Sequence, residues 1–437
     1  MNSTSQALLD FIHSSPSCFH VIDNIRRLLD AQGYTQLPEG KAWTLVPGAG
    51  YYVIRNGSSI IAFRVPKQGL QGFMITASHS DAPTFKIKEH AELTVENRYI
   101  QLNTERYGGM LCATWLDRPL SVAGRVLVNC GDAVETRLVN VDRDLLLIPN
   151  VAIHMNRNAN EGYHWNANTD LFPLFGEITE KDSFRKMIAA EAGADEADLL
   201  GTDLFLYCRT PGTVWGADNN FISAPRLDDL QCAFASVQAF LQAEESESMP
   251  VCCVFDNEEV GSTTKQGAAS TFLPDVLRRI NAALGRTEAE YSMAVANSFL
   301  VSADNAHAVH PNHPEYADKT HRPVLNGGIV IKFNANQRYT TDAVSCAVFS
   351  KLCERAGVPV QHFTNRSDLA GGSTLGNIAS TQVSLNSVDI GLPQLAMHSA
   401  YETAGAADTD ALIRALTVFF GSSLEAEADG RYRISAR

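Results

Sequence analysis

Hydrophobic residues recur at helical spacing over residues 6–34, and strand-like segments follow them. Gly33 ends the second of two predicted helices, and the segment 72–78 is an apolar run typical of a strand buried on both faces. From residue 213 onward helices are predicted over 227–243, 272–284 and 340–356, and strands over 251–255, 299–302, 329–333 and 360–363. This alternation predicts an α/β fold whose central sheet is mostly parallel and covered by helices.

The middle of the chain has a different pattern. Between residues 88 and 212, short half-alternating segments predict strands over 99–103, 120–128, 134–141 and 144–148, and one long helical pattern covers 181–200. Such alternation favours an antiparallel, β-rich unit. We therefore predict one α/β domain made of residues 1–87 and 213–437, interrupted by a β-rich domain over residues 88–212.

Composition and charge narrow the class of protein. The 437 residues are 45% hydrophobic and 19% charged, which is ordinary globular usage, and the length suits two domains. A net charge of −14 and the lack of any basic run argue against nucleic acids and anionic membranes as partners. No apolar run approaches the ~20 residues that span a bilayer, and residues 1–6 lack the features of a signal peptide. We therefore expect a cytoplasmic protein.

The nine cysteines are scattered singly, apart from Cys252 and Cys253 in a predicted apolar strand. An odd number without any Cys-x-x-Cys pair predicts buried reduced thiols, not a disulfide framework or a thiolate zinc site. Candidate metal ligands are therefore sought among His, Asp and Glu.

Histidine and acidic side chains follow several of the predicted strands. His79 comes directly after the apolar segment 72–78, and Asp81, two residues further on, can support it. Asp304 and His398 also follow apolar segments. Each of these residues alone also suits an ordinary surface or core position. Because ligands of open α/β sheets bind at the carboxyl ends of strands, we take them together as candidates for one site.

Two further clusters contain only carboxylates: Asp228 and Asp229 at the start of the predicted helix 227–243, and Asp256, Glu258 and Glu259 after the strand 251–255. An acid at a helix start can cap the helix while its neighbour faces a cavity. Three carboxylates within four residues repel each other unless a cation or solvent compensates them. Because the second cluster follows a strand expected in the middle of the sheet, metal binding is favoured there over a solvated loop.

Two histidines and three carboxylates, with no thiolate among them, are typical of hydrolases that hold two metal ions bridged by one carboxylate. Imidazole and carboxylate ligands suit zinc, and Mn²⁺ or Co²⁺ remain possible. A spare glutamate beside a ligating one, as in the pair Glu258-Glu259, is placed to accept a proton from the attacking water.

The same residues lie in longer motifs that resemble the M18 family of metallo-aminopeptidases, the aspartyl aminopeptidases. The similarity covers nearly the whole chain, and the motifs occur in order: His79-Ser80-Asp81, Tyr107-Gly108-Gly109, Trp115 to Leu120, Ala152-Ile153-His154, Arg226 to Asp229, Asp256 to Ser262, Ser302-Ala303-Asp304, His307 to Asn312, and Pro393 to Ser399. The resemblance implies a zinc-peptidase fold, similar to the phosphorylase/hydrolase-like α/β domain. It also implies that the inserted domain serves dimerisation and that the subunits assemble as a homododecamer.

The resemblance further implies a role for each site residue. Asp228 would bridge two zinc ions per subunit, His79 and Asp304 would complete one site, and Glu259 and His398 would complete the other. The remaining implied roles are Glu258 as general base, Asp81 as the partner of His79, Lys332 with His307 and Tyr339 as the site for an acidic substrate side chain, and His154 as a residue given to a neighbouring subunit's active site. The expected activity is removal of N-terminal residues, preferentially Asp or Glu, from peptides.

Other functions remain as alternatives. A dinuclear zinc deacylase or carboxypeptidase on the same core would need a cationic group for a substrate carboxylate. A catalytically silent shell or cargo protein of the same fold would lack a ligand or the base, whereas all six positions are present. An enzyme that uses nucleoside triphosphates is not supported, because the segment 371–376 lacks the lysine of a phosphate-binding loop. From sequence alone, His154 is also compatible with a structural role.

Overall fold

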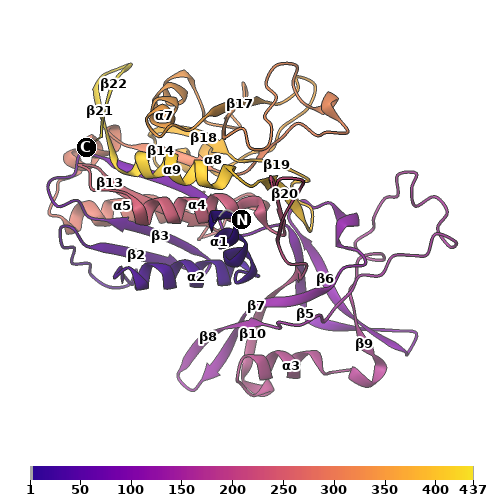
Figure 1. Ribbon diagram of the computed structural model, residues 1–437. Helices are drawn as coiled ribbons and strands as arrows, with labels where there is room; N and C mark the ends of the chain where they lie inside the picture. The colour runs from indigo at the N-terminus through magenta and orange to yellow at the C-terminus, as the bar shows by residue number, and fades with distance from the viewer. Residues whose placement is uncertain (1–2, 437) are drawn as a thin grey trace.

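The computed structural model describes residues 3–436, and Figure 1 shows a layered α/β part with a smaller β-rich part projecting from it. The α/β part is built around a nine-stranded sheet in the order β1 (Thr35–Gln36), β2 (Gly50–Arg55), β3 (Ser59–Arg64), β13 (Met249–Phe255), β4 (Phe73–His79), β14 (Phe299–Ala303), β18 (Asn386–Gly391), β16 (Ile329–Phe333) and β17 (Val360–Thr364). The central strands β13, β4, β14 and β18 are parallel to one another. Antiparallel pairs join β2 to β3, β3 to β13, and β18 to β16. The predicted α/β class is confirmed, and the sheet is mixed.

Helices cover both faces of this sheet: α1 (Ser3–His13), α2 (Cys18–Ala31), α4 (Leu227–Gln242), α7 (Ala343–Arg355) and α9 (Asp408–Phe420) on one face, and α5 (Phe272–Ala283), α6 (Glu288–Ala296) and α8 (Leu375–Gln382) on the other. Side chains along the central strands alternate between the two cores. Met74 and Cys252 belong to the first core, and Ile75 and Cys253 belong to the second. A strand buried on both faces must be apolar throughout, which explains the continuous hydrophobic runs that predicted β4 and β13.

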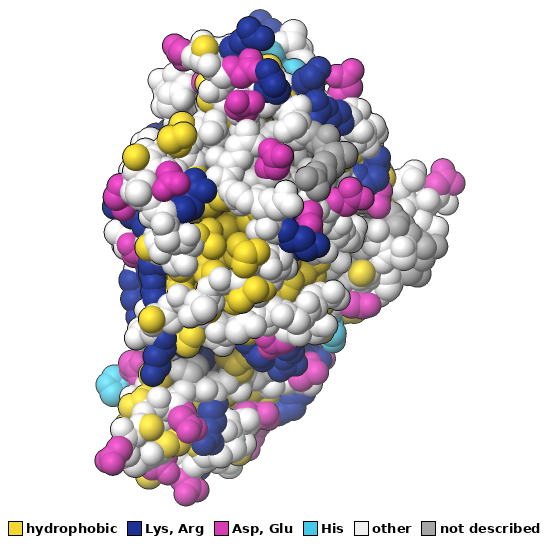
Figure 2. Space-filling model, turned by 90° about the vertical axis from the view of Figure 1, so that its left-hand side faces the viewer, with side chains coloured by type: hydrophobic (Ala, Val, Ile, Leu, Met, Phe, Trp, Pro, Cys, Tyr) yellow, Lys and Arg dark blue, Asp and Glu magenta, His cyan; other side chains and the backbone are white. Residues whose placement is uncertain are grey.

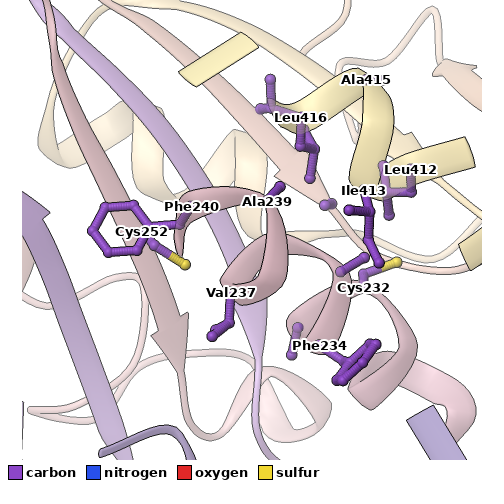
Figure 3. Close-up of a cluster of buried hydrophobic side chains, with 14 of the residues drawn as sticks. Cys232, Phe234, Val237, Ala239, Phe240, Cys252, Leu412, Ile413, Ala415 and Leu416 are labelled. Atoms are coloured by element: carbon purple, nitrogen blue, oxygen red, sulfur yellow. The ribbon is translucent and has the colours of Figure 1, made fainter. Parts of the chain in front are cut away.

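Helices α4 and α9 pack side by side on the sheet (Figure 1), and Figure 3 shows the side chains of α4 meeting those of α9 and of Cys252. Most of its residues are buried, so the amphipathic pattern predicted for residues 227–243 is wrong, although the extent is nearly right. The Phe240 ring lies 5.5 Å from that of Tyr34 and 5.6 Å from that of Phe420, centroid to centroid. Because α4 contacts the sheet, α9 and α1, it has little surface left for solvent.

The β-rich part is a six-stranded sheet in the order β8 (Ala133–Asn140), β7 (Leu120–Cys130), β10 (Leu199–Cys208), β5 (Thr84–Val95), β6 (Tyr99–Tyr107) and β9 (Leu174–Glu177). Its neighbouring strands are antiparallel, and α3 (Phe184–Glu191) packs into its core. Residues 144–148 contribute only isolated bridges, so the strand predicted there is wrong. The predicted boundary at residue 87 falls within β5, and the domain limits stay a prediction.

The rest of the chain connects and closes these parts. A five-stranded sheet has the strand order β11 (Thr213–Trp215), β12 (Phe221–Ala224), β20 (Glu402–Gly405), β19 (Pro393–Leu395) and β15 (Ala306–His307). Strands β21 (Ser422–Ala428) and β22 (Arg431–Ala436) form a separate two-stranded sheet. The nine cysteines are free thiols, as predicted; Cys130 and Cys346 are only half-buried, so for these two the predicted burial is wrong. Within residues 3–436, every helix is too short or too polar to cross a bilayer.

Candidate metal centre

The predicted metal ligands meet at one edge of the central sheet. His79 is the last residue of β4, Asp304 directly follows β14, and the short helix η4 (Glu258–Val260) follows β13. Because these three strands are adjacent and parallel, their carboxyl ends lie at the same edge. Asp228 reaches this edge from the start of α4, and His398 reaches it from the loop between β19 and β20.

Asp228 lies between the two histidines. Its Oδ1 is 3.5 Å from Nε2 of His79, and its Oδ2 is 3.5 Å from Nε2 of His398. Nε2 of His398 is also 3.4 Å from Oε2 of Glu259, whose side chain is only 4% exposed, so the alternative of a solvated loop is wrong. Among the described residues, donor atoms lie within 4.8 Å of one another in three groups. Two of them share Asp228: His79, Asp228, Asp229 and Asp304, and Asp228, Glu259 and His398. The third is made of His79, Glu258 and Glu259.

The cluster contains buried acceptors without a partner. Among the described residues, Oδ1 of Asp228, Oδ1 of Asp229 and Oε1 of Glu259 receive no hydrogen bond. An unpaired buried carboxylate oxygen is costly, and crowded carboxylates repel one another. Cations would supply both the missing partner and the missing charge. A donor set of imidazole and carboxylate groups without thiolate fits zinc.

Crowding and burial shift the protonation of these carboxylates. Burial, followed by the charge of Asp228, raises the pKa of Glu259 well above its ordinary value. Burial, together with neighbouring carboxylates such as Asp304, raises the pKa of Glu258 to about 8. Burial also acts to raise the pKa of Asp228, but its interactions with the two histidines outweigh burial, and this pKa is lowered. Asp228 therefore stays an anion between the two histidines.

Asp81 contacts both His79 and the glutamate loop. Nδ1 of His79 lies 3.0 Å from the main-chain oxygen of Asp81 and 3.4 Å from its Oδ1. The same carboxylate accepts hydrogen bonds from the main-chain N–H groups of Glu258 (3.1 Å) and Glu259 (3.2 Å). Asp229 accepts the main-chain N–H of His79 at 3.0 Å and does not cap α4, whose backbone is non-helical at that residue. Both acids thus hold the main chain of site residues in place.

Glu402 is a site residue that the sequence pattern missed. It is 1% exposed, and it accepts the main-chain N–H of Asp228 on Oε2 (3.0 Å) and that of His398 on Oε1 (2.7 Å). Burial, followed by the charge of Asp228, raises its pKa well above its ordinary value. The one signal in the sequence is its position four residues after His398.

The predicted substrate residues line a cleft of about 440 Å³ that opens onto the cluster. Nζ of Lys332 donates to the main-chain oxygen of Asp304 at 2.8 Å and lies 3.7 Å from its carboxylate, which is the pairing that a lysine in a buried strand requires. The same Nζ lies 5.3 Å from the ring centroid of Tyr339. His307 lines the cleft as an exposed residue, and loss of solvation, followed by the charge of Lys332, lowers its pKa.

His154 is the one predicted site residue that the structure does not bring to the cluster. It lies in the exposed segment between β8 and β9, which extends away from both sheets in Figure 1. Its neighbours Ile153 and Met155 are 48% and 82% exposed. Within one chain it belongs to none of the groups of described residues that could hold a metal.

The chain is similar to known proteins along nearly its whole length. The family model described as aminopeptidase I zinc metalloprotease (M18) matches residues 11–420. A probable M18 family aminopeptidase 2 of Clostridium novyi is 46% identical over 409 residues, which cover 92% of this chain and 94% of that protein. One of Pseudomonas aeruginosa is 42% identical over 427 residues, with 96% and 98% covered.

Solved structures resemble the fold closely. The cryo-EM structure of the Ape4 and Nbr1 complex has a TM-score of 0.93 at 36% identity and covers 96% of this chain and 85% of that one. The S. cerevisiae mApe1 dodecamer has a TM-score of 0.84 at 30% identity and covers 96% of each chain. With the family model matching residues 11–420, this chain belongs to the M18 family of zinc metalloaminopeptidases.

Proposed function

We propose that this chain is a dinuclear zinc aminopeptidase that removes N-terminal Asp or Glu from peptides. The observation that carries the proposal is the position of Asp228, 3.5 Å from both His79 and His398. Asp228, His79 and Asp304 would hold one ion, and Asp228, Glu259 and His398 would hold the other. Two zinc ions, when bound, supply the Lewis acidity that activates a water molecule and polarises the scissile carbonyl.

Glu258 is the general base of this proposal. It lines the cleft beside Glu259, and Asp81 holds its main-chain N–H. Its carboxylate accepts a proton from the attacking water and passes that proton to the leaving amine. A pKa that burial raises to about 8 suits a group that must both accept and release a proton near neutral pH.

Lys332 provides the preference for an acidic first residue. Of the described residues that line the cleft, it is the one lysine or arginine. Its bonds to the main chain of Asp304 and Asn305 fix the ammonium group at the cleft wall. A fixed cation there favours a substrate side chain that carries a carboxylate.

Assembly completes the proposed enzyme. The β-rich part, predicted over residues 88–212 between two segments of the α/β domain, would form the dimer contact, and dimers would build a dodecamer. The likeness to the dodecameric S. cerevisiae mApe1 supports this assembly. His154, exposed in its own chain, would enter the cleft of a neighbour.

One experiment tests the function. Zinc per chain is measured together with hydrolysis of the Asp-, Glu-, Leu- and Lys-p-nitroanilides and of an N-blocked peptide, with and without chelator. We expect two zinc ions, Asp and Glu substrates cleaved about tenfold faster or more, and activity lost with chelator and restored by zinc. Cleavage of the Leu and Lys substrates as fast as that of the Asp and Glu substrates would reject the acidic preference. Preference for the blocked peptide would favour the deacylase or carboxypeptidase alternative.

A further inference from the structure

Glu402 joins two separate segments that carry metal-binding residues. It is the first residue of β20, which pairs with β12 on one side and β19 on the other, so its own backbone is fixed. From there one carboxylate oxygen receives the N–H of Asp228 at the start of α4. The other receives the N–H of His398 in the loop after β19. A single buried side chain thereby sets the spacing of these two segments.

Both segments have a backbone that needs such support. His398 has a φ of 66° and Ala396 a φ of 57°, a left-handed conformation that is strained for an L-residue. Arg226, two residues before Asp228, has a φ of 58°. Without an acceptor for its N–H, the His398 loop is free to relax away from Asp228. The imidazole would move with it, because a side chain follows the Cα that carries it.

The two carboxylate oxygens of Glu402 receive the N–H groups of Asp228, which belongs to both groups that contain it, and of His398, which belongs only to the group with Glu259. In the group with His79, a different acid, Asp229, holds the main chain of His79. We infer that Glu402 is a positioning residue that sets the metal affinity of the site formed by Asp228, Glu259 and His398. This inference rests on the proposed function, because it presupposes a centre that holds two ions.

Glu402→Gln tests the inference with little change of shape. Glutamine offers one acceptor oxygen, so its NH₂ group must face one of the two main-chain N–H groups. Asp408→Asn is the matched control. Asp408 is also 1% exposed and accepts two main-chain N–H groups, from Asn326 (2.8 Å) and Gly328 (3.0 Å), but belongs to none of the metal-binding groups of the described chain.

Zinc content at buffered free zinc, Co²⁺ absorption titration and thermal unfolding are measured for wild type and both variants. We expect both variants to unfold earlier than wild type. Wild type and Asp408→Asn should bind two ions alike, whereas Glu402→Gln should bind one ion normally and the second roughly 10–100-fold more weakly. Two ions bound with wild-type affinity by Glu402→Gln would overturn the inference.

A second variant tests the inference if Glu402→Gln fails to fold. Glu402→Asp keeps both acceptor oxygens but withdraws them by one methylene, and it should show the same selective loss of the second ion. Wild-type affinity for both ions in that variant would again overturn the inference. A wild-type protein that binds fewer than two ions, or that releases no N-terminal residue, would instead refute the proposed function.

Discussion

Glu258 and Glu259 are adjacent in sequence, yet the structure gives them different surroundings. Asp81 accepts the main-chain N–H of both, which fixes the loop that carries them. One carboxylate oxygen of each lies within 4.8 Å of the other and of a ring nitrogen of His79, and both residues line the cleft. Glu259 comes within 3.4 Å of His398 and shares a donor group with Asp228. Glu258 lines the cleft. Two residues of the same type can therefore divide the tasks of ligand and base.

Glu258→Gln separates these tasks. The amide keeps the size of the side chain but cannot accept the proton, so we expect kcat to fall by ~10²–10⁴ or more. Zinc content should stay near that of wild type, because Glu259 provides the ligand. Kinetics with Asp-p-nitroanilide and zinc analysis of the same sample measure both. Loss of both zinc ions in the variant would count against the role of Glu258 as base.

The sequence could predict which residues form the candidate site but not which residues hold them in position. His79, Asp304 and Glu259 follow apolar strands, and the carboxyl ends of parallel strands meet, so their convergence is readable from pattern. Glu402 and Asp229 act on main-chain N–H groups, which nearly every residue carries, so the sequence does not show which N–H group each acid accepts. The positioning role of these two acids can be seen only in the structure.

At the scale of elements, predictability depends on how each element is buried. Strands β4, β13 and β16 were predicted nearly to the residue because both of their faces are covered. Helix α9 was missed; most of its residues are buried, and its polar face is the narrow stripe of Asp410, Arg414 and Thr417. Strand β5 was missed because its pairing with β6 shifts register between Ile87 and Glu92, which breaks the alternation of inward and outward side chains.

Helix α4 carries Asp228 at its start and depends on its aromatic contacts. Phe240 is fully buried between Tyr34 and Phe420. Phe240→Ala should lower the free energy of unfolding by ~3–5 kcal/mol, because the cavity cannot close fully. Denaturant unfolding measures this, with Val46→Ala at an exposed position as the control. A loss under about 1 kcal/mol would show that the surrounding rings collapse into the space.

Helix α2 should make stability sensitive to acid. His20 is half-buried, with Nδ1 2.8 Å from Oγ of Ser17, and burial lowers its pKa to about 4. Its pKa in the unfolded chain is about 6.5, so the folded protein binds fewer protons between these values. Stability should therefore fall as pH drops from 6.5 to 4, by up to about 3 kcal/mol.

Unfolding free energies of wild type and His20→Gln across pH 4–7 check this expectation. The variant lacks the titrating group, so wild type should lose stability relative to it as the pH falls. Comparing the two proteins cancels the titration of the carboxylates in the proposed metal centre, which both contain. Parallel curves would contradict a lowered pKa for His20.

At the scale of the whole molecule, apolar surface points to contacts with other chains. Figure 2 shows hydrophobic side chains gathered in the middle of one face, with acidic and basic side chains interspersed around them. The segment that contains His154 also exposes Val151, Ile153 and Met155, at 52%, 48% and 82%. Exposed apolar side chains in this number favour burial against a partner. A neighbouring subunit is the partner that the proposed assembly supplies.

Mixed assemblies test whether His154 serves a neighbour. Chains carrying His154→Ala and chains carrying Glu258→Gln are expected to be inactive alone, since each assembly lacks one group at every site. In a one-to-one mixture, a His154→Ala chain keeps its own base and can receive His154 from a Glu258→Gln neighbour. Random pairing should then restore about a quarter of wild-type activity.

The control for this recovery pairs Glu258→Gln with His398→Ala. Both changes disable the centre of the chain that carries them, so a His398→Ala chain stays inactive whatever its neighbour provides, and no activity should return on mixing. Recovery with His154→Ala but not with His398→Ala can arise only if His154 crosses between subunits. Two outcomes would contradict this role: activity of the His154→Ala assembly alone, or no recovery in either mixture. The histidine would then act within its own β-rich part, and the active site would be complete in a single chain.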